Sequence, residues 1–490
     1  MRFLLDTNIL IPLEDSQIPL QESLANFVRL SNQHGHQLVY HPASVDDIQR
    51  DTNVDRRTKT LQRLKQYVCL DERPVCPWNT AGIAQNDAAD NEILYALYCD
   101  AVHALVTEDR GIHDKARAGG LLGRVYTIQT AEDWLRRLYE PRTVVLPNIE
   151  EVELYSLTPE LPIPFFDSLR ASYAGFDDWF RAKARDGRRA WVSRQPDRQL
   201  GAVCVFAHQH REQITEEGRK LHGAGLKLCT FKVDAPVRGR KIGELFLKAA
   251  FRHATAHRLE EIFIHGDDQD HFLFGLLQDF GFSHIGLHPG SGGRDAVYLK
   301  EHPINPPTNL LNSFAYLRQY FPHFRRDEAV KKFIVPIKPE YHDVLFPDYP
   351  FAKDMQLGLF KSQSQVGNAI KLAYLCHAQT KVISPGDLAL FYRSGDQSAV
   401  TSLGVVESYE TLMDASIVAG RVKRRTVYSM EEIAEMVRRP TRVMLFRLVR
   451  HFQQPLDLTW LKSHGVTKGA PQSIVQISSV AFEKVFANGQ

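Results

Sequence analysis

The sequence contains no apolar run approaching the ~20 residues that a membrane-spanning helix needs, so we expect no membrane association. Its six cysteines show neither disulfide nor zinc spacing, which indicates buried thiols in a reducing cytoplasm. The opening apolar run is too short for a signal peptide and meets an acid at once, so a cytoplasmic protein is expected. The formal net charge is only +2, and any surface for nucleic acid must therefore be local.

The composition that remains is that of an ordinary globular protein, with 43% hydrophobic and 24% charged residues. A chain of 490 residues is long enough for several domains of roughly 100–200 residues each. Prolines gather near residues 141–164 and again near 303–307, where we expect connectors. The sequence therefore predicts a multidomain α/β protein with three domains, at residues 1–145, 150–302 and 308–490.

Acidic residues stand at the ends of two predicted strands in the first third. The apolar run 3–5 is typical of a buried parallel strand, and Asp6 follows it directly. A second such run, 104–106, is followed by Thr107 and Asp109. Because the carboxyl ends of parallel strands meet at the same edge of a sheet, both acids are expected in one crevice.

Further acids lie on predicted helices of the same segment. Ser44 is predicted to cap a helix that carries Asp47, with Asp46 beside it, and Asp90 lies at the start of another helix. Carboxylates brought together raise one another's pKa, and a divalent cation such as Mg²⁺ or Mn²⁺ would resolve that repulsion. Two such ions could support phosphodiester hydrolysis. In the alternative reading, Asp90 belongs only to a helix cap and Asp109 only to a turn.

Leu5-Asp6-Thr7-Asn8 and Thr107-Glu108-Asp109 together resemble the PIN-domain ribonucleases over nearly all of residues 1–145. The resemblance implies a parallel-sheet α/β/α domain with metal-dependent endoribonuclease activity. Asn8 and Thr107 would orient the acids or the attacking water, and Asp114 is a further candidate ligand. The implied metal ligands and catalytic acids are Asp6, Asp47, Asp90 and Asp109.

The middle third contains a strand, a glycine-containing turn and the start of a helix. The strand is predicted at 226–233 and the helix from Ile242 onward. Backbone N–H groups at a helix N-terminus point at one place, which favours a pyrophosphate there. An ordinary strand-to-helix connection remains the alternative. The residues predicted to bind the cofactor are Val233, Arg238, Gly239, Arg240, Lys241, Ile242 and Gly243.

This turn resembles the acetyl-CoA loop of the GNAT acetyltransferases, and the helix that ends in Gly281-Phe282 resembles a later part of the same family. The resemblance implies an α+β domain with a mixed sheet, acetyl-CoA as cofactor and acetyl transfer to an amine. Lys241 replaces the usual middle glycine, which requires right-handed helical backbone there. Leu277 replaces the usual tyrosine acid, so His265 or Asp234 is the candidate catalytic group, or the domain binds acetyl-CoA without efficient turnover.

The last third is predicted to be rich in short strands, near 383–392, 401–406 and 443–449. The Pro-Gly-Asp turn at 385–387 resembles the PUA-like group, which includes the ASCH domains. That resemblance implies a small β-barrel with helices that binds RNA. Basic residues could supply the phosphate contacts, although a solvated charged face is the alternative. The nucleic-acid-binding residues predicted are Arg424, Arg425, Arg439 and Arg442.

Taken together, these patterns predict an RNA-directed enzyme that joins a PIN-like metal-dependent ribonuclease, a GNAT-like acetyl-CoA-dependent N-acetyltransferase and a PUA-like RNA-binding module. Two alternatives stay open. In one, the first domain is a non-cleaving scaffold and the protein acetylates another protein or a small amine. In the other, acetyl-CoA binding regulates RNA binding.

Overall fold

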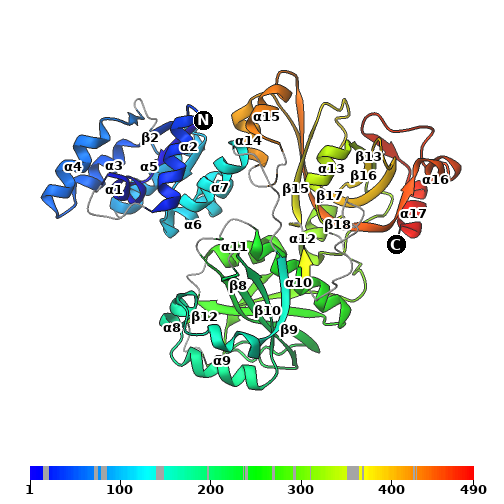
Figure 1. Cartoon of the computed structure of the whole chain (residues 1–490), viewed down its shortest axis with the longest axis horizontal. Helices are drawn as coiled ribbons and strands as arrows, with labels where there is room; N and C mark the ends of the chain where they lie inside the picture. The colour runs from blue at the N-terminus through cyan, green and yellow to red at the C-terminus, as the bar shows by residue number, and fades with distance from the viewer. Residues whose placement is uncertain are drawn as a thin grey trace. The chain divides into compact units, whose positions relative to one another are not determined.

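The structure is a computed structural model (Figure 1) that describes residues 1–14, 21–70, 75–78, 85–139, 148–195, 198–234, 237, 241–267, 271–290, 294–308, 311–349, 364–366, 369–422, 425 and 428–489. The chain forms two compact units. Unit 1 consists of Met1–Arg142 and Leu412–Thr441, and unit 2 of Thr143–Thr411 and Arg442–Gln490. Within the described ranges, no helix has the length and apolar content to cross a membrane.

Unit 1 is built on a five-stranded sheet with the strand order β3-β2-β1-β4-β5. Every neighbouring pair in this sheet is parallel. The strands are β1 (Arg2–Leu5), β2 (Gln37–Tyr40), β3 (Val68–Cys69), β4 (Ala104–Val106) and β5 (Val125–Tyr126). The helices are α1 (Thr7–Glu14), α2 (Glu22–Gln33), α3 (Pro42–Gln49), α4 (Val54–Leu64), α5 (Gln85–Tyr98), α6 (Arg110–Ala118), α7 (Ile128–Tyr139), α14 (Ala415–Val422) and α15 (Met430–Met436).

The predicted apolar runs form the two central strands of this sheet. The side chains of Phe3, Leu4 and Leu5 are fully buried, as are those of β4. Phe3 packs edge-on against Trp134 of α7, with ring centroids 5.6 Å apart. Strands buried on both faces need apolar residues at successive positions, which is why these short runs could be identified from the sequence.

Residues 412–441 form a helical insertion between two strands of the C-terminal sheet, yet they belong to unit 1. A capping box begins α15, because Ser429 Oγ accepts from the N–H of Glu432 while the Glu432 carboxylate accepts from the N–H of Ser429. Local capping was readable from the sequence, but the association of this segment with the first domain was not. The division into residues 1–145, 150–302 and 308–490 stays a proposal.

Unit 2 contains an eight-stranded mixed sheet with the order β11-β12-β10-β9-β8-β7-β6-β14. Its strands are β6 (Asn148–Glu153), β7 (Arg189–Arg194), β8 (Leu200–His210), β9 (Ala224–Val233), β10 (Glu261–Asp267), β11 (Ser283–Leu287), β12 (Asp295–Glu301) and β14 (Ser364–Val366). Its helices are α8 (Asp167–Ser172), α9 (Phe176–Arg185), α10 (Ile242–Ala256) and α11 (His271–Asp279). The strand β14, although far along the chain, pairs antiparallel with β6.

Helices cover both faces of this sheet. On one face, Phe246 and Ala250 of α10 pack with Ile262 and Ile264 of β10. On the other face, Phe180 of α9 belongs to a separate cluster of buried side chains. The two sets alternate along β7 and β8, which follows from the two-residue period of a strand.

A second sheet in unit 2 has six strands in the order β15-β18-β17-β16-β13-β19. The strands β13 and β16 are parallel, while β15 and β18 are antiparallel. Its strands are β13 (Lys332–Ile337), β15 (Lys371–Cys376), β16 (Leu388–Arg393), β17 (Ala399–Leu412), β18 (Thr441–Asp457) and β19 (Val475–Ile477). The accompanying helices are α12 (Ser313–Tyr320), α13 (Pro339–Leu345), α16 (Leu458–Ser463) and α17 (Ser479–Asn488).

One local prediction is wrong in detail. Ser44 does not cap α3, because the helix begins at Pro42 and the His41 ring accepts from the N–H of Ala43 as the N-cap. Proline at the first helical position, with its fixed φ, outweighs a capping serine two residues later. The side chain of Asn312 caps α12 by accepting from the N–H of Ala315.

Candidate functional site

The parallel strands β9 and β10 pair over only part of their length. Gly225–Leu228 of β9 lie opposite Glu261–Ile264 of β10, and the described pairing stops there. Beyond this point β9 continues against β8, and β10 continues against β12. Among the described residues, β9 and β10 therefore form no ladder pairs with each other beyond Leu228 and Ile264. Two neighbouring strands that separate in this way leave a gap that an extended backbone can enter.

A β-bulge lies where the two strands part. Phe206 of β8 pairs with Leu228, and the preceding Val205 pairs with Thr230, so Cys229 is an extra residue on β9. A bulge bends the strand and increases its twist. The bulge at Cys229 therefore accounts physically for the divergence of β9 from β10.

The chain returns from β9 to the start of α10 at this same end of the sheet. Gly243, in the first turn of α10, leaves little room for a side chain: a Cβ there would lie 2.9 Å from a methyl group of Leu276, which would have to shift, and 3.6 Å from the ring of Phe231. Val233, also predicted to bind the cofactor, is the last residue of β9, and Ile242 is the first of α10. The predicted Arg238, Gly239 and Arg240 lie outside the described residues.

Lys241 corrects the expectation of right-handed backbone at the middle position of the loop. Its φ of 60° and ψ of 20° place it in the left-handed region, as the N-cap of α10. The usual glycine adopts that conformation without strain, whereas a residue with a Cβ does so at a cost of about 1–2 kcal/mol. The Lys241 ammonium donates to the carbonyl of Lys371, 2.8 Å away, which ties the side chain to the C-terminal part of unit 2.

His265 is the first residue of β10 beyond the paired segment, so it stands where the strands separate. Its Nδ1 lies 2.9 Å from a carboxylate oxygen of Asp295 on β12. Asp295 is 6% exposed, and the rings of His265 and His288 stack with centroids 3.7 Å apart. A carboxylate at one ring nitrogen fixes the imidazole and leaves the other nitrogen free to exchange protons. Sequence reasoning missed Asp295, which lies 30 residues away and has no local motif.

Leu277, at the position where the resemblance would place a tyrosine, has a fully buried side chain in the core beneath α11. It offers no proton donor. Gly281, predicted to end this helix, has a φ of 84° and supplies the turn into Phe282. The helix expected from the resemblance is therefore present as α11. At the position of the expected tyrosine, however, it has a leucine that packs in the core.

In unit 1, Asp6 is at the centre of a hydrogen-bond network between β1 and β4. Thr107 donates its hydroxyl to Asp6 Oδ2 at 2.6 Å, and the N–H of Thr7 donates to Asp6 Oδ1 at 2.7 Å. Asn8 Nδ2 donates to Thr107 Oγ1 at 3.2 Å. Burial raises the pKa of Asp6 to about 6, against these hydrogen bonds, and the charges of Asp90 and Asp109 raise it further.

The other predicted acids surround this network with partners of their own. Asp109 caps α6 by accepting from the N–H of Ile112 at 3.0 Å, and Asp47 accepts from the hydroxyl of Thr7 at 3.4 Å while also pairing with Arg50. Burial raises the pKa of Asp90, although Lys115 opposes the shift.

Lys115 was missed by sequence reasoning, and it changes the electrostatics of the acids. Its ammonium bridges Asp87 at 2.8 Å and Asp90 at 2.9 Å. Asp114, predicted as an extra ligand, pairs with Arg117 at 2.8 Å. Lys115 lies on α6, whereas Asp87 and Asp90 lie on the preceding helix, α5. No sequence spacing connects these two helices.

The donors in unit 1 fit Mg²⁺ or Mn²⁺ in kind, because these ions prefer carboxylate and hydroxyl oxygens. Among the described residues, however, no three aspartates bring one oxygen each within 4.8 Å of one another. Binding of a divalent cation would therefore require the carboxylates to move closer together. The cation would also compete with the Lys115 ammonium for Asp90. The chemistry of the set fits a divalent cation, while its present spacing is looser than a finished coordination shell.

The predicted nucleic-acid-binding arginines divide between the two units. Arg425 and Arg439 belong to unit 1 and Arg442 to unit 2, while Arg424 lies outside the described residues. Arg439 is exposed. Arg442 is half-buried, donates from Nε to the carbonyl of Ala378 at 3.2 Å and lies over the Tyr409 ring. Arg442 therefore already has a structural role in β18.

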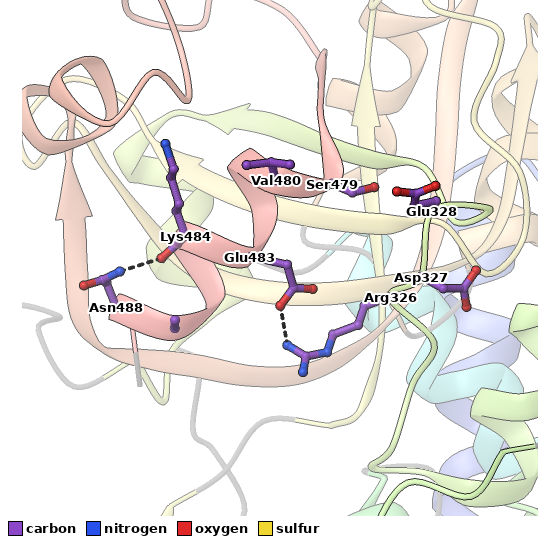
Figure 2. A pocket seen from close by; sticks show the side chains of 9 residues that line it. Arg326, Asp327, Glu328, Ser479, Val480, Glu483, Lys484 and Asn488 are labelled. Carbon is purple, nitrogen blue, oxygen red and sulfur yellow. Dashed lines mark hydrogen bonds and ion pairs between the residues drawn. The ribbon is translucent and has the colours of Figure 1, made fainter.

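Figure 2 shows a surface pocket of about 640 Å³ between the 326–328 segment and α17. Two bases and three acids line it, and Arg326 pairs with Glu483 at 2.7 Å. None of the predicted site residues lines it. A lining with more acids than bases does not favour a phosphate ligand, so this pocket supports neither the cofactor site nor the nucleic-acid surface.

No family model matches the chain, and no curated protein matches its sequence. Solved structures are similar to part of it. ASCH from Zymomonas mobilis is 13% identical, covering 32% of this chain and 94% of its own, with a TM-score of 0.25. A GNAT-family acetyltransferase from Staphylococcus aureus Mu50 is 15% identical (32% and 99% covered, TM-score 0.25), and the IAA acetyltransferase from Bacillus cereus is 15% identical (31% and 97% covered, TM-score 0.22).

The similar structures thus have ASCH and GNAT acetyltransferase folds over a partial region of the chain, and the fold class seen here is multidomain α/β with parallel and mixed sheets. At these TM-scores they carry no argument about activity. None of the three is described as a nuclease, so the PIN-like interpretation of residues 1–145 stays a proposal. The functional proposals below rest on the residues of this chain.

Proposed function

We propose that residues 150–302 bind acetyl-CoA and transfer its acetyl group to an amine. The observation that carries this proposal is the separation of β9 and β10 beyond Leu228 and Ile264, beside the N-terminus of α10. The gap offers strand-edge backbone groups to an extended ligand. The pantetheine arm of CoA carries amides, which can pair with such groups as an added strand does. The helix N-terminus favours the pyrophosphate at its end.

His265 fits the role of general base for this transfer. An amine attacks the thioester only as the free base, so a group near the reacting carbonyl must accept its proton. His265 lies at the point of strand separation, and Asp295 stabilises the imidazolium that forms when the ring takes that proton. The attacking nitrogen forms the new C–N bond, and the CoA thiolate leaves with the electrons of the C–S bond. With Leu277 buried, CoA leaves as the thiolate without a protein acid at that position.

Gly243→Glu is expected to abolish acetyl-CoA binding, because a side chain at this position meets Leu276 and Phe231 and places a negative charge where phosphates would lie. Isothermal titration calorimetry of the full chain with acetyl-CoA measures the effect. Gly223→Glu is the matched control, since a Cβ at Gly223 would meet nothing within 4 Å and its backbone is not left-handed. Absence of heat with the parent protein would reject the cofactor proposal, and equal affinity in Gly243→Glu would place the cofactor elsewhere.

We propose as a second function that unit 1 cleaves RNA with the help of Mg²⁺ or Mn²⁺. The observation that favours it is the buried Asp6 carboxylate, held by Thr107 and close enough to Asp90 and Asp109 for their charges to raise its pKa. Asp6, Asp90 and Asp109 would hold the metal, with Asp47 beside them through Thr7. The metal would activate water and stabilise the leaving oxygen. Thr107 and Asn8 would hold the Asp6 carboxylate in place.

Cleavage of labelled RNA in the presence of Mn²⁺ tests this second function. The double variant Asp6→Asn and Asp109→Asn is expected to lose cleavage, because it removes two of the carboxylates that would hold the cation. Asp100→Asn is the matched control, since Asp100 pairs with Arg124, is 83% exposed and belongs to no proposed site. Cleavage that persists in the double variant, or its absence from the parent protein, would leave unit 1 as a non-cleaving scaffold, and the protein would then be chiefly an acetyltransferase.

A further inference from the structure

Three histidines converge at the C-terminal end of α10, the opposite end of this helix from the proposed cofactor site. His253 lies in the last turn of α10, His257 is its C-cap four residues later, and His208 lies on β8. One ring nitrogen from each lies within 4.8 Å of those of the other two. Nε2 of His208 and Nε2 of His253 are 2.7 Å apart, and the rings of His253 and His257 stack with centroids 4.1 Å apart.

Local contacts orient two of these rings. Nδ1 of His257 lies 2.9 Å from the carbonyl oxygen of His253, so it donates there and leaves Nε2 unprotonated as the nitrogen that can bind a cation. The ring of His253 packs edge-on against Phe206 and Trp191, with centroids 4.8 Å and 5.6 Å away. A ring held by packing on one side and facing a second imidazole on the other is well placed as a ligand.

The end of the helix also favours a cation. The last turn of a helix carries partial negative charge on its free carbonyl groups, which attracts a cation.

We propose that His208, His253 and His257 form a zinc-binding site that joins the end of α10 to β8. Three imidazole nitrogens at 2.0–2.1 Å from Zn²⁺, in tetrahedral geometry, lie roughly 3.3 Å from one another. The 2.7 Å contact between His208 and His253 needs to widen by only several tenths of an ångström. Rotation of the exposed His208 ring can provide this movement. Water would take the fourth position, because two of the three histidines are exposed.

The expected role is structural. His253 lies eleven residues after Ile242, about 16 Å along the helix axis from the N-terminus proposed for the pyrophosphate. A metal at this end cannot contact the acetyl group. It would instead hold α10 against the sheet at one end while the other end binds the cofactor. This proposal does not depend on the acetyltransferase function, since both can succeed or fail separately.

The site is tested by treating the full chain with a chelator and then titrating it with ZnCl₂. Calorimetry measures the zinc affinity, and thermal unfolding measures the change in melting temperature. We expect the parent protein to bind one zinc ion. Replacing an exposed ligand, in His208→Ala or in His257→Ala, should lower the affinity for zinc at least ~10-fold. The melting temperature of the parent should rise with zinc, and those of the two variants should not. Co²⁺ should give a visible absorption band of tetrahedral intensity in the parent alone.

His464→Ala is the matched control. The Nδ1 of His464 also contacts a carbonyl four residues earlier, that of Trp460, at 2.9 Å, but among the described residues His464 belongs to no cluster of three possible metal ligands. Zinc binding should be unchanged in this variant. Equal zinc affinity in the parent, His208→Ala and His257→Ala would overturn the proposal, as would a parent protein that binds no zinc. Melting temperatures measured without metal show whether the variants are folded before zinc is added.

Discussion

Replacing His265 with alanine is expected to lower the rate of acetyl transfer by about 10²–10⁴-fold while leaving the affinity for acetyl-CoA nearly unchanged. The ring lies at the separation of β9 and β10 and is fixed by Asp295. A group that only accepts a proton contributes to the transition state more than to the binding of the cofactor. The two readouts therefore separate a catalytic role from a packing role.

The rate is measured as release of the CoA thiol, using the most active amine from a panel of lysine peptides, polyamines and aminoglycosides. Calorimetry gives the acetyl-CoA affinity of the same protein. Asp295→Asn is expected to give a smaller loss of rate, because Asp295 positions the imidazole and does not touch the substrate.

The matched control is His222→Ala. His222 also pairs through Nδ1 with a buried carboxylate, that of Glu261 at 2.9 Å, but Glu261 is at the opposite end of β10, where the strands are paired. The rate should be unchanged in this variant. An equal loss in both variants would mean that removing any histidine from this sheet damages the fold. A normal rate in His265→Ala would show that another group accepts the proton.

The order of strands and helices could be predicted where it depended on local patterns. The run 3–5 is buried on both faces and therefore wholly apolar, and the run before Pro236 leads into the helical spacing of α10. The hairpin β7–β8 follows from a turn flanked by strand-forming residues. In each case the residues that decide the structure are neighbours in the sequence.

Contacts between distant segments could not be predicted in the same way. The strand β14 joins the edge of a sheet whose other strands lie at 148–301, and residues 412–441 join unit 1. Edge strands and inserted helices have no side-chain pattern that specifies their partner. The same limit applies to the site, where His265 was identified but its partner Asp295 was not.

The histidine cluster is a mixed case. The spacing His253-x-x-x-His257 places two imidazoles on one face of a helix and is visible in the sequence once α10 is predicted. The third ligand, His208, comes from β8 and is brought there only by the packing of α10 on the sheet. A pair of histidines on a helix therefore predicts half of a site, and the fold supplies the remainder.

Asp6→Asn is expected to stabilise unit 1 at neutral pH while removing the proposed nuclease activity. Burial raises the pKa of Asp6 to about 6 in the folded state, above its ordinary value of 3.8. In the window between these values the folded protein binds more protons than the unfolded chain, so its stability falls as pH rises. A pKa shift of about two units corresponds to about 3 kcal/mol of the free energy of unfolding, and this contribution is lost once the pH is well above 6. Asparagine carries no charge and escapes this loss.

The gain should be smaller than that figure, since asparagine can accept from either Thr107 or Thr7 but not from both, which costs about 1 kcal/mol. We therefore expect a net stabilisation of about 2 kcal/mol at pH 7.5 and a slight destabilisation at pH 4. Native-state hydrogen exchange of peptides that cover β1 and β4 in the full chain, corrected for intrinsic rates, measures this local free energy at each pH.

Asp109→Asn provides the comparison. Asp109 is exposed, and asparagine serves as a helix cap about as well as aspartate, so little change with pH is expected from this variant. A stabilisation by Asp6→Asn that is the same at both pH values would contradict the linkage, and a loss of stability at pH 7.5 would show that the hydrogen bonds outweigh burial. A confirmed gain would mean that unit 1 keeps a buried carboxylate at the expense of stability, which packing alone does not explain and which a cation-binding role does.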